Sequence, residues 1–157
     1  MLFHYLYSEI ILYIKDQSKG ITEIEKKLSM MGNDIGRRLC ELYHMKMKVT
    51  HLEGDMLSML NFISNDLWRK LFDKAADGLE KSTNEDVVEY MIIDNDPFTN
   101  QFISMPKGLE KMSCASLIGG IIESFVNGNG FKVSVTSFNV PADGWSNRTV
   151  FLLKPFQ

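Results

Sequence analysis

The first apolar positions of the chain recur on more than one side of a predicted helix. Between Leu2 and Ile14 almost every helical turn carries large apolar residues, which fall in two adjacent rows: Leu6, Ile10 and Ile14 in one, and Phe3, Tyr7 and Ile11 in the other. A helix that is apolar on several sides is either buried all round or shared with a partner. The run is shorter than the ~20 apolar residues of a membrane-spanning helix, and His4 and Glu9 interrupt it.

A second amphipathic helix is predicted after the polar stretch from Asp16 to Gly20. Thr22 and Glu25 have the spacing of a capping box at its start. Its apolar face consists of Ile24, Leu28, Met31, Ile35, Leu39 and Leu42. Gly32 and Gly36 lie one turn apart, and each costs about 0.8–1 kcal/mol of helix stability relative to alanine. Such a cost indicates close approach of another backbone, and the sequence leaves open whether it belongs to the same fold or to another chain.

A third helix is predicted from Asp55 to Lys81. Its apolar residues share one broad stripe at helical spacing: Ile63, Leu67, Trp68, Leu71 and Phe72. An aromatic stripe of this kind is most often structural core. The segment from Trp68 to Glu80 runs on into a charged end that contains Gly78.

After the third helix the pattern becomes strand-like. Residues Val87 to Asp94 are rich in β-branched and apolar side chains, the turn Asn95-Asp96-Pro97 follows, and Gln101 to Met105 is predicted as the returning strand of a hairpin. A helix capped by Ser113 is predicted to run through Phe125.

Two further strands complete the predicted order of elements. Phe131 to Asn139 alternates between apolar and polar side chains, and a last strand is predicted from Thr149 to Lys154. The order α-α-α-β-β-α-β-β indicates an α+β fold with helices against an antiparallel sheet.

Composition limits the size and the partners of this fold. With 157 residues, of which 45% are hydrophobic, the chain can bury one large core, and we expect residues 1–157 to form a single domain. A formal net charge of -3 argues against nucleic acid as a partner. Arg37, Arg38, Lys46 and Lys48 form either a local basic patch for acidic partners or, more simply, a solvated helix face.

Cysteine content indicates the compartment. Cys40 and Cys114 are the two cysteines of the chain and cannot form the disulfide framework of a small secreted domain. The apolar N-terminal run lacks the basic start and the small-residue cleavage site of a signal peptide. We therefore expect a cytoplasmic protein, in which the glycosylation match at Asn147 is unused.

Candidate catalytic and metal-binding residues are few, and for each of them a purely structural role is the alternative. Cys114 near a helix start is a candidate thiolate, yet no histidine is placed as its base. Cys40 and His44 lie one turn apart like metal ligands, with His51 downstream, but zinc needs more donors. Asp94 and Asp96 flank a turn. Without a phosphate-binding or dinucleotide-binding glycine motif, we expect no catalytic residue, no metal and no cofactor.

Several short segments follow one another in an order and spacing that together are specific. They are Tyr7-Ser8-Glu9, Met31-Gly32, Ile35-Gly36-Arg37-Arg38-Leu39, the Trp68 to Glu80 segment, Phe102-Ile103-Ser104-Met105-Pro106-Lys107, Cys114-Ala115-Ser116, Gly120-Ile121-Ile122-Glu123 and Gly130-Phe131. On these residues the chain resembles the small-subunit family of TRAPP, the transport protein particle, and within it the subunit 5 branch. The resemblance covers nearly the whole chain.

The resemblance implies a fold and a role. The fold has helices on one face of a four-stranded antiparallel sheet. Family members assemble into an elongated complex that tethers vesicles and catalyses nucleotide exchange on a Rab-type GTPase between endoplasmic reticulum and Golgi. Because other subunits form the exchange site, this chain would be a scaffold subunit that contacts other small subunits, touches the Rab-type GTPase and membranes only indirectly, and self-associates when isolated.

Two sets of residues follow as expectations. We expect a partner interface on the first two helices at Leu6, Ile10, Ile14, Ile24, Leu28, Gly32, Ile35 and Gly36. We expect the family signature to contribute core residues at Trp68, Leu71, Phe72, Ala76 and Leu79.

One departure from the family concerns lipid. A related small subunit carries a fatty-acylated cysteine in the loop after the second helix, whereas residues His44 to Asp55 contain no cysteine and Cys40 lies earlier, on the helix. A covalent lipid is therefore not expected. The alternative function is a stand-alone sensor of small molecules or lipids, with a similar fold and a closed apolar pocket.

Overall fold

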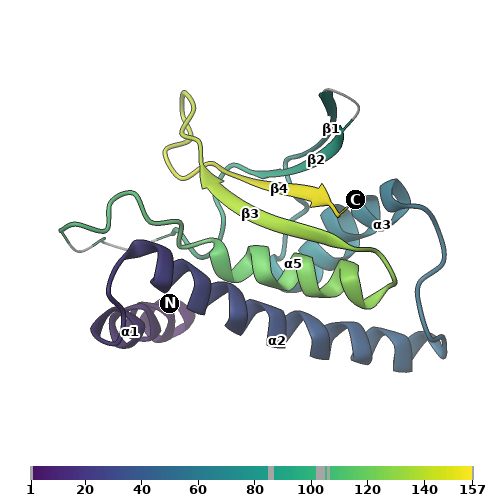
Figure 1. The fold of residues 1–157 in the computed structure, drawn as a ribbon, viewed down its shortest axis with the longest axis horizontal. Coiled ribbons are helices and arrows are strands. Elements are labelled where there is room, and N and C mark those ends of the chain that lie inside the picture. Colours follow the sequence, from purple (N-terminus) through teal and green to yellow (C-terminus); the bar gives the residue numbers. More distant parts are fainter. Residues whose placement is uncertain (1, 85–86, 102–104, 106, 157) are drawn as a thin grey trace.

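Helices and strands follow one another along the chain in the predicted order (Figure 1). The computed structural model describes residues 2–84, 87–101, 105 and 107–156. Its elements are α1 (Leu2–Asp16), α2 (Ile21–Met47), α3 (Met56–Phe62), the π-helix η1 (Ile63–Leu67), α4 (Trp68–Phe72), β1 (Gly78–Asn84), β2 (Val87–Asp94), α5 (Ser116–Gly128), β3 (Val133–Asn139) and β4 (Thr149–Pro155). Within those residues, none of the helices combines the length and the apolar character that crossing a membrane requires.

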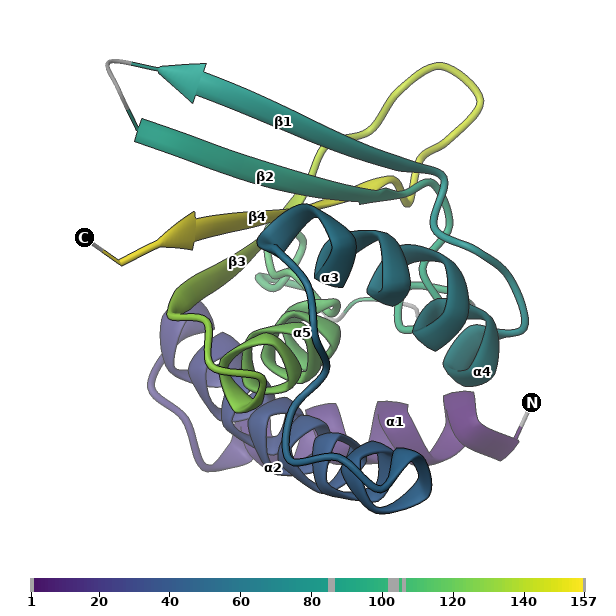
Figure 2. The same cartoon turned by 90° about the vertical axis from the view of Figure 1, so that its right-hand side faces the viewer.

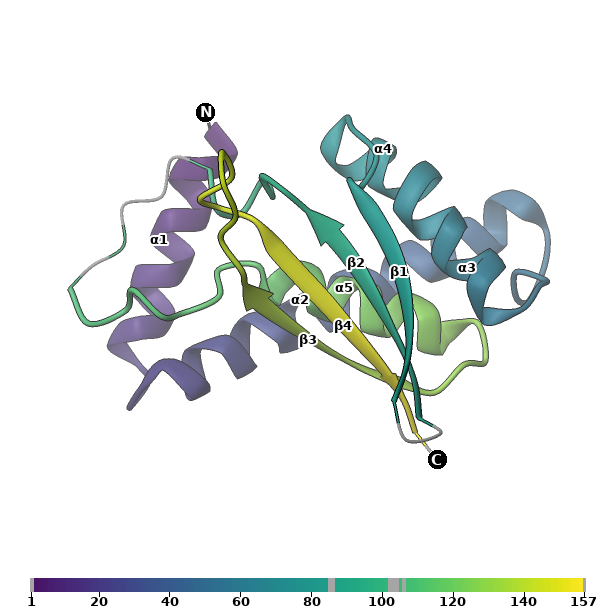
Figure 3. The same cartoon turned by 90° about the horizontal axis from the view of Figure 1, so that it is seen from above.

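The four strands form one antiparallel sheet in the order β1-β2-β4-β3. Its register pairs Ile92 with Phe151 and Val135 with Leu153, so these apolar side chains share one face. Helix α5 lies against that face, and α2 lies beyond α5 (Figure 1). Helices α3 and α4 cover the part of the sheet near β1 and β2 (Figure 2). Seen from above, the sheet lies over the helices (Figure 3), and the predicted α+β class is confirmed.

The predicted third helix is too long. The observed helical segment ends at Phe72, because Asp73 adopts a left-handed backbone with φ of 60°, and the residues from Gly78 onward form strand β1. The N–H of Ala76 donates to the carbonyl of Ser64 at 2.8 Å, which turns the chain back from the π-helix toward the sheet. The charged end of the family signature is therefore an edge strand, not a helix terminus.

The predicted hairpin partner of β2 is also wrong. Strand β2 pairs with β1 on one side and with β4 on the other, so both of its edges are taken. Gln101 lies in a turn and Met105 lies outside any strand, while positions 102–104 of that prediction fall outside the described residues.

Two predicted helix caps are wrong as well. Helix α2 begins at Ile21 after Gly20, and no side chain caps it. The Glu25 carboxylate instead accepts from the backbone N–H of Ser113 at 2.7 Å. Helix α5 begins at Ser116, and the hydroxyl of Ser113 bonds to the hydroxyl of Ser137 at 2.9 Å.

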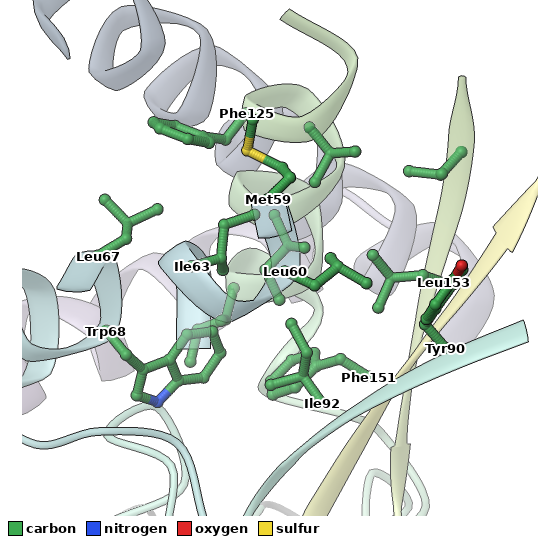
Figure 4. Packing of buried hydrophobic residues seen from close by; sticks show 14 of the residues in the cluster. Met59, Leu60, Ile63, Leu67, Trp68, Tyr90, Ile92, Phe125, Phe151 and Leu153 are labelled. Carbon is green, nitrogen blue, oxygen red and sulfur yellow. The ribbon is translucent and has the colours of Figure 1, made fainter. Parts of the chain in front are cut away.

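The main core lies between the sheet and the helices. Its buried residues are Cys40, Met59, Leu60, Ile63, Leu67, Trp68, Tyr90, Ile92, Ala115, Ile118, Ile122, Phe125, Val126, Val133, Phe151 and Leu153 (Figure 4). Of the signature residues, Trp68 is fully buried, and Leu71, Phe72, Ala76 and Leu79 are partly buried and pack against this core. Burial of such side chains stabilises the fold by about 1.5–3 kcal/mol each.

A second buried cluster attaches α1. It consists of Tyr7, Ile11, Ile14, Ile24, Leu28, Leu109, Met112, Cys114 and Leu117. The Tyr7 hydroxyl donates to the backbone carbonyl of Cys114. Helix α1 is thus held by the start of α2 and by the segment that leads into α5.

Candidate functional site

The partner interface expected from the sequence divides into a buried part and an exposed part. Ile14, Ile24 and Leu28 are buried in the second cluster, and Gly32 and Gly36 are buried against α5. Those five residues are corrected to core, because the chain's own helices already cover them.

The glycines of α2 face another helix of the same chain. A Cβ atom built on Gly32 would lie 2.0 Å from the carbonyl oxygen of Leu117, and one on Gly36 would lie 2.4 Å from that of Ile121. On α5, a Cβ on Gly120 would lie 2.1 Å from the carbonyl oxygen of Ser29. The predicted close approach is present, and it joins α2 to α5.

The exposed part of the expected interface continues the same row of α2. The row reads Ile24, Leu28, Met31, Ile35 and Leu42 at coiled-coil spacing, with Arg38 between the last two. Its first two members lie under α1, whereas Met31, Ile35 and Leu42 are exposed. An apolar row that is covered by one helix over part of its length and exposed over the rest is suited to pack against another helix.

Helix α1 adds apolar side chains on the side away from its buried cluster. Leu2, Tyr5, Leu6, Leu12 and Tyr13 are exposed, and Ile10 is half-buried against the second cluster. Together with Met31, Ile35 and Leu42 of α2, these five exposed residues make up what we call the α1–α2 surface. Of the residues expected from the sequence it retains Leu6 and Ile35, with Ile10 at its edge.

Charges beside this surface largely cancel one another. Arg37 lies 3.8 Å from Asp34 and 3.8 Å from Glu41, and all three side chains are exposed. Exposed ion pairs contribute about 0–1 kcal/mol to stability. These exposed ion pairs are consistent with the prediction that Arg37 and Arg38 lie on a solvated helix face.

The candidate metal ligands belong to a polar cluster that connects neighbouring parts of the fold. The Cys40 sulfur lies 3.5 Å from His44 Nε2, which lies 2.8 Å from Asn129 Oδ1. Asn129 also donates to the Phe125 carbonyl and accepts from the Leu52 N–H, so it joins α2, the following loop and α5. Over the described part of the chain, no three histidine, cysteine, aspartate or glutamate side chains gather into a group able to hold a metal ion.

The two thiols lie in environments that disfavour the thiolate. Desolvation and the Glu25 carboxylate raise the pKa of Cys114 to about 11. Desolvation and the Glu41 carboxylate also raise the pKa of Cys40. Neither thiol is activated as a nucleophile would be.

Thiol labelling checks these environments. At pH 8 we expect both cysteines of the native chain to react with iodoacetamide much more slowly than in denaturant, because only the thiolate attacks and burial restricts access. The rate for Cys114 should rise as the pH approaches about 11. Labelling of the native chain at pH 8 as fast as in denaturant, followed by mass spectrometry, would contradict this placement.

Asp94 belongs to a buried polar group rather than to a catalytic pair. Its carboxylate is fully buried and accepts from Trp68 Nε1 at 2.9 Å, from the N–H of Asp96 at 3.0 Å, and from the ammonium of Lys74. Lys74 also donates to the carbonyl of Asp96 at 3.0 Å. These bonds tie α4 to the end of β2, a structural role that the turn pattern alone did not indicate.

Three pockets lie among the described residues. Two of 210 Å³ lie between α2 and β3 and beside Cys114, and one of 320 Å³ lies between Phe131 and Phe156. Sites for small ligands usually measure about 300–1,000 Å³. Two of these pockets fall below that range and the third lies at its lower limit, so the three offer little support for the sensor function.

Comparison with known proteins places this chain and its fold in a family. Residues 3–155 match the family described as "Transport protein particle (TRAPP) component". The chain belongs to the TRAPP family. It is 45% identical over 153 residues to trafficking protein particle complex subunit 5 of Dictyostelium discoideum, across 97% of this chain and 82% of that protein. Identity to subunit 5 of Homo sapiens is 30% over 152 residues, across 97% of this chain and 77% of the human protein.

These relatives confirm the subunit 5 branch of TRAPP. Among solved structures, subunit 3 from Naegleria fowleri, covalently bound to palmitic acid, superposes with a TM-score of 0.81 over 99% of this TRAPP chain and 94% of that one. Its sequence identity is 16%, so this likeness concerns the fold. The α+β TRAPP small-subunit fold is confirmed.

Proposed function

We propose that this chain, as one domain, is a non-catalytic scaffold subunit of a TRAPP-like vesicle-tethering complex. In this proposal the complex acts as a nucleotide exchange factor for a Rab-type GTPase in transport from the endoplasmic reticulum to the Golgi. The chain is cytoplasmic and reaches Golgi and endoplasmic reticulum membranes as a peripheral component. The names of its relatives as complex subunits support membership in such an assembly.

The α1–α2 surface is the observation that carries the proposal. On α2, Met31, Ile35 and Leu42 continue the apolar row beyond the buried Ile24 and Leu28, and on α1 Leu6 and the four other apolar residues of this surface are exposed. Large numbers of exposed apolar residues on one part of a soluble protein mark interaction sites. We propose that another TRAPP small subunit covers them.

Charge substitutions on this surface test the proposal. Ile35→Asp and Leu6→Asp are expected to weaken assembly with other TRAPP small subunits by at least about tenfold, because a carboxylate would be buried without a partner. Both side chains are exposed, so the isolated variants should keep the circular dichroism spectrum and the unfolding midpoint of the wild type. Assembly is measured by co-purification of the tagged variant with other TRAPP small subunits.

Val140→Asp is the matched control. Val140 is 41% exposed and follows strand β3, whereas Ile35 is 40% exposed on α2. The control should assemble like the wild type. If Ile35→Asp and Leu6→Asp also assemble like Val140→Asp, the α1–α2 surface is not the interface. Ile10 is unsuitable for this test because it packs against the second cluster and its substitution would also destabilise the fold.

A further inference from the structure

Side chains from α5 block the first part of one edge of the sheet. Strand β3 lies at that edge. Just before it, the carbonyl of Lys132 accepts from the N–H of Phe156. Because backbone groups point alternately to the two sides of a strand, those of Val133 and Val135 point away from β4. Asn127 donates to the Val133 carbonyl at 3.0 Å and accepts from the Val133 N–H at 2.8 Å. Glu123 accepts from the Val135 N–H at 2.8 Å. These bonds occupy the backbone groups that an added strand would use at the start of β3.

The opposite edge has no comparable closure. Strand β1 pairs only with β2 in the observed sheet order. Across the described ranges, with gaps at 85–86, 102–104 and 106, no side chain bonds to the backbone of residues 78–83. Figure 2 shows β1 as the outermost strand of the sheet. Edge strands with unpaired N–H and C=O groups are templates for another extended chain.

We propose that β1 is a docking edge for an extended segment of a different protein chain. The segment carries an acidic residue opposite Lys81 and a basic residue opposite Glu80. Both of these β1 side chains are exposed, and as neighbours in a strand they point to opposite faces of the sheet. The backbone groups of β1 select an extended chain, and the two charges select its sequence and register.

The charges of β1 disfavour a second copy of this chain in the register that pairs both strands along their full length. Antiparallel pairing of two complete β1 strands places Lys81 directly opposite Lys81 of the other copy. A shift of the register by two residues places Glu80 opposite Glu80. Like charges directly opposite each other destabilise strand pairing, whereas opposite charges stabilise it.

The docking edge goes beyond the proposed scaffold function and uses a different part of the molecule. Strand β1 belongs to the sheet, and the α1–α2 surface lies on the helices (Figure 1). A charge exchange on β1 should therefore leave assembly through α1 and α2 unchanged, so the two proposals fail independently.

A peptide titration of the full chain tests the docking edge. The probe is the capped peptide TVTEKVT, which in antiparallel pairing with β1 sets its Glu opposite Lys81 and its Lys opposite Glu80. We expect amide shifts across residues 78–83 in nuclear magnetic resonance spectra, and slowed amide exchange at the alternate residues whose N–H groups point away from β2. The peptide TVTKEVT, with the two charges exchanged, should bind about tenfold more weakly, because both pairs become repulsive.

The double variant Glu80→Lys, Lys81→Glu is the matched protein control. It should reverse the order of the two peptides and still assemble with other TRAPP small subunits. Equal binding of both peptides to both proteins, or no protection of residues 78–83, would overturn the proposal. Protection of these amides that grows with protein concentration in the absence of peptide would overturn it in favour of a second copy.

Discussion

Gly120→Ala is expected to lower the free energy of unfolding by about 3 kcal/mol, the range of strongly overpacked cores. The added Cβ would lie 2.1 Å from the carbonyl oxygen of Ser29 and 2.9 Å from the backbone nitrogen of Asn33. Both contacts are to the backbone of α2, so relief requires the two helices to separate. The loss should exceed the helix propensity that alanine adds, about 1 kcal/mol. Urea unfolding followed by circular dichroism measures the difference.

The neighbouring Gly119 provides the matched control. A Cβ there would meet its first neighbour, the Val135 side chain, at 3.8 Å, an ordinary contact. Gly119→Ala should therefore raise the free energy of unfolding by about 0.5–1 kcal/mol through helix propensity. Equal unfolding midpoints for Gly119→Ala and Gly120→Ala would contradict the close packing of α2 against α5.

Asp94→Ala is expected to lower the free energy of unfolding by about 3–5 kcal/mol, the loss typical when one partner of a buried charged pair is removed. The substitution leaves the indole N–H of Trp68 and the N–H of Asp96 without their acceptor, and it removes the anion that the Lys74 ammonium contacts. Unfolding in urea, followed by circular dichroism, measures the loss.

Asp94→Asn separates the charge from the hydrogen bonds. The amide oxygen can still accept from Trp68, so the free energy of unfolding of this variant should fall by only about 1–2 kcal/mol. Asp66→Ala, at an exposed position of η1, should leave stability within about 0.5 kcal/mol of the wild type. An Asp94→Ala protein as stable as Asp66→Ala would contradict the buried polar group.

Sequence periodicity predicted the helices and most strands because each carries its own pattern. Trp68, Leu71 and Phe72 repeat at helical spacing, and Val133 and Val135 alternate with polar residues. The end of the third helix was missed because residues 78–84 are mostly polar and carry little local preference for a strand. They form β1 because they pair with β2, and such pairing is a tertiary effect.

The residues of the predicted interface divide into buried and exposed ones where local pattern and tertiary burial differ. Leu28 and Ile35 belong to one apolar row of α2 and are indistinguishable by spacing. Leu28 is covered by α1, whereas Ile35 extends beyond it. Likewise, the loss of helix stability that Gly32 brings indicated that another backbone approaches closely. Only the fold identifies that backbone as α5.

The central claim is that this chain works as a scaffold subunit, and one measurement tests it most directly. The tagged chain is purified from its own cells, the co-purifying proteins are identified, and the eluate is assayed for nucleotide exchange on a Rab-type GTPase. We predict that other TRAPP subunits co-purify and that the eluate has exchange activity which the isolated chain lacks. Recovery of the chain alone, folded and without exchange activity in the eluate, would contradict the claim.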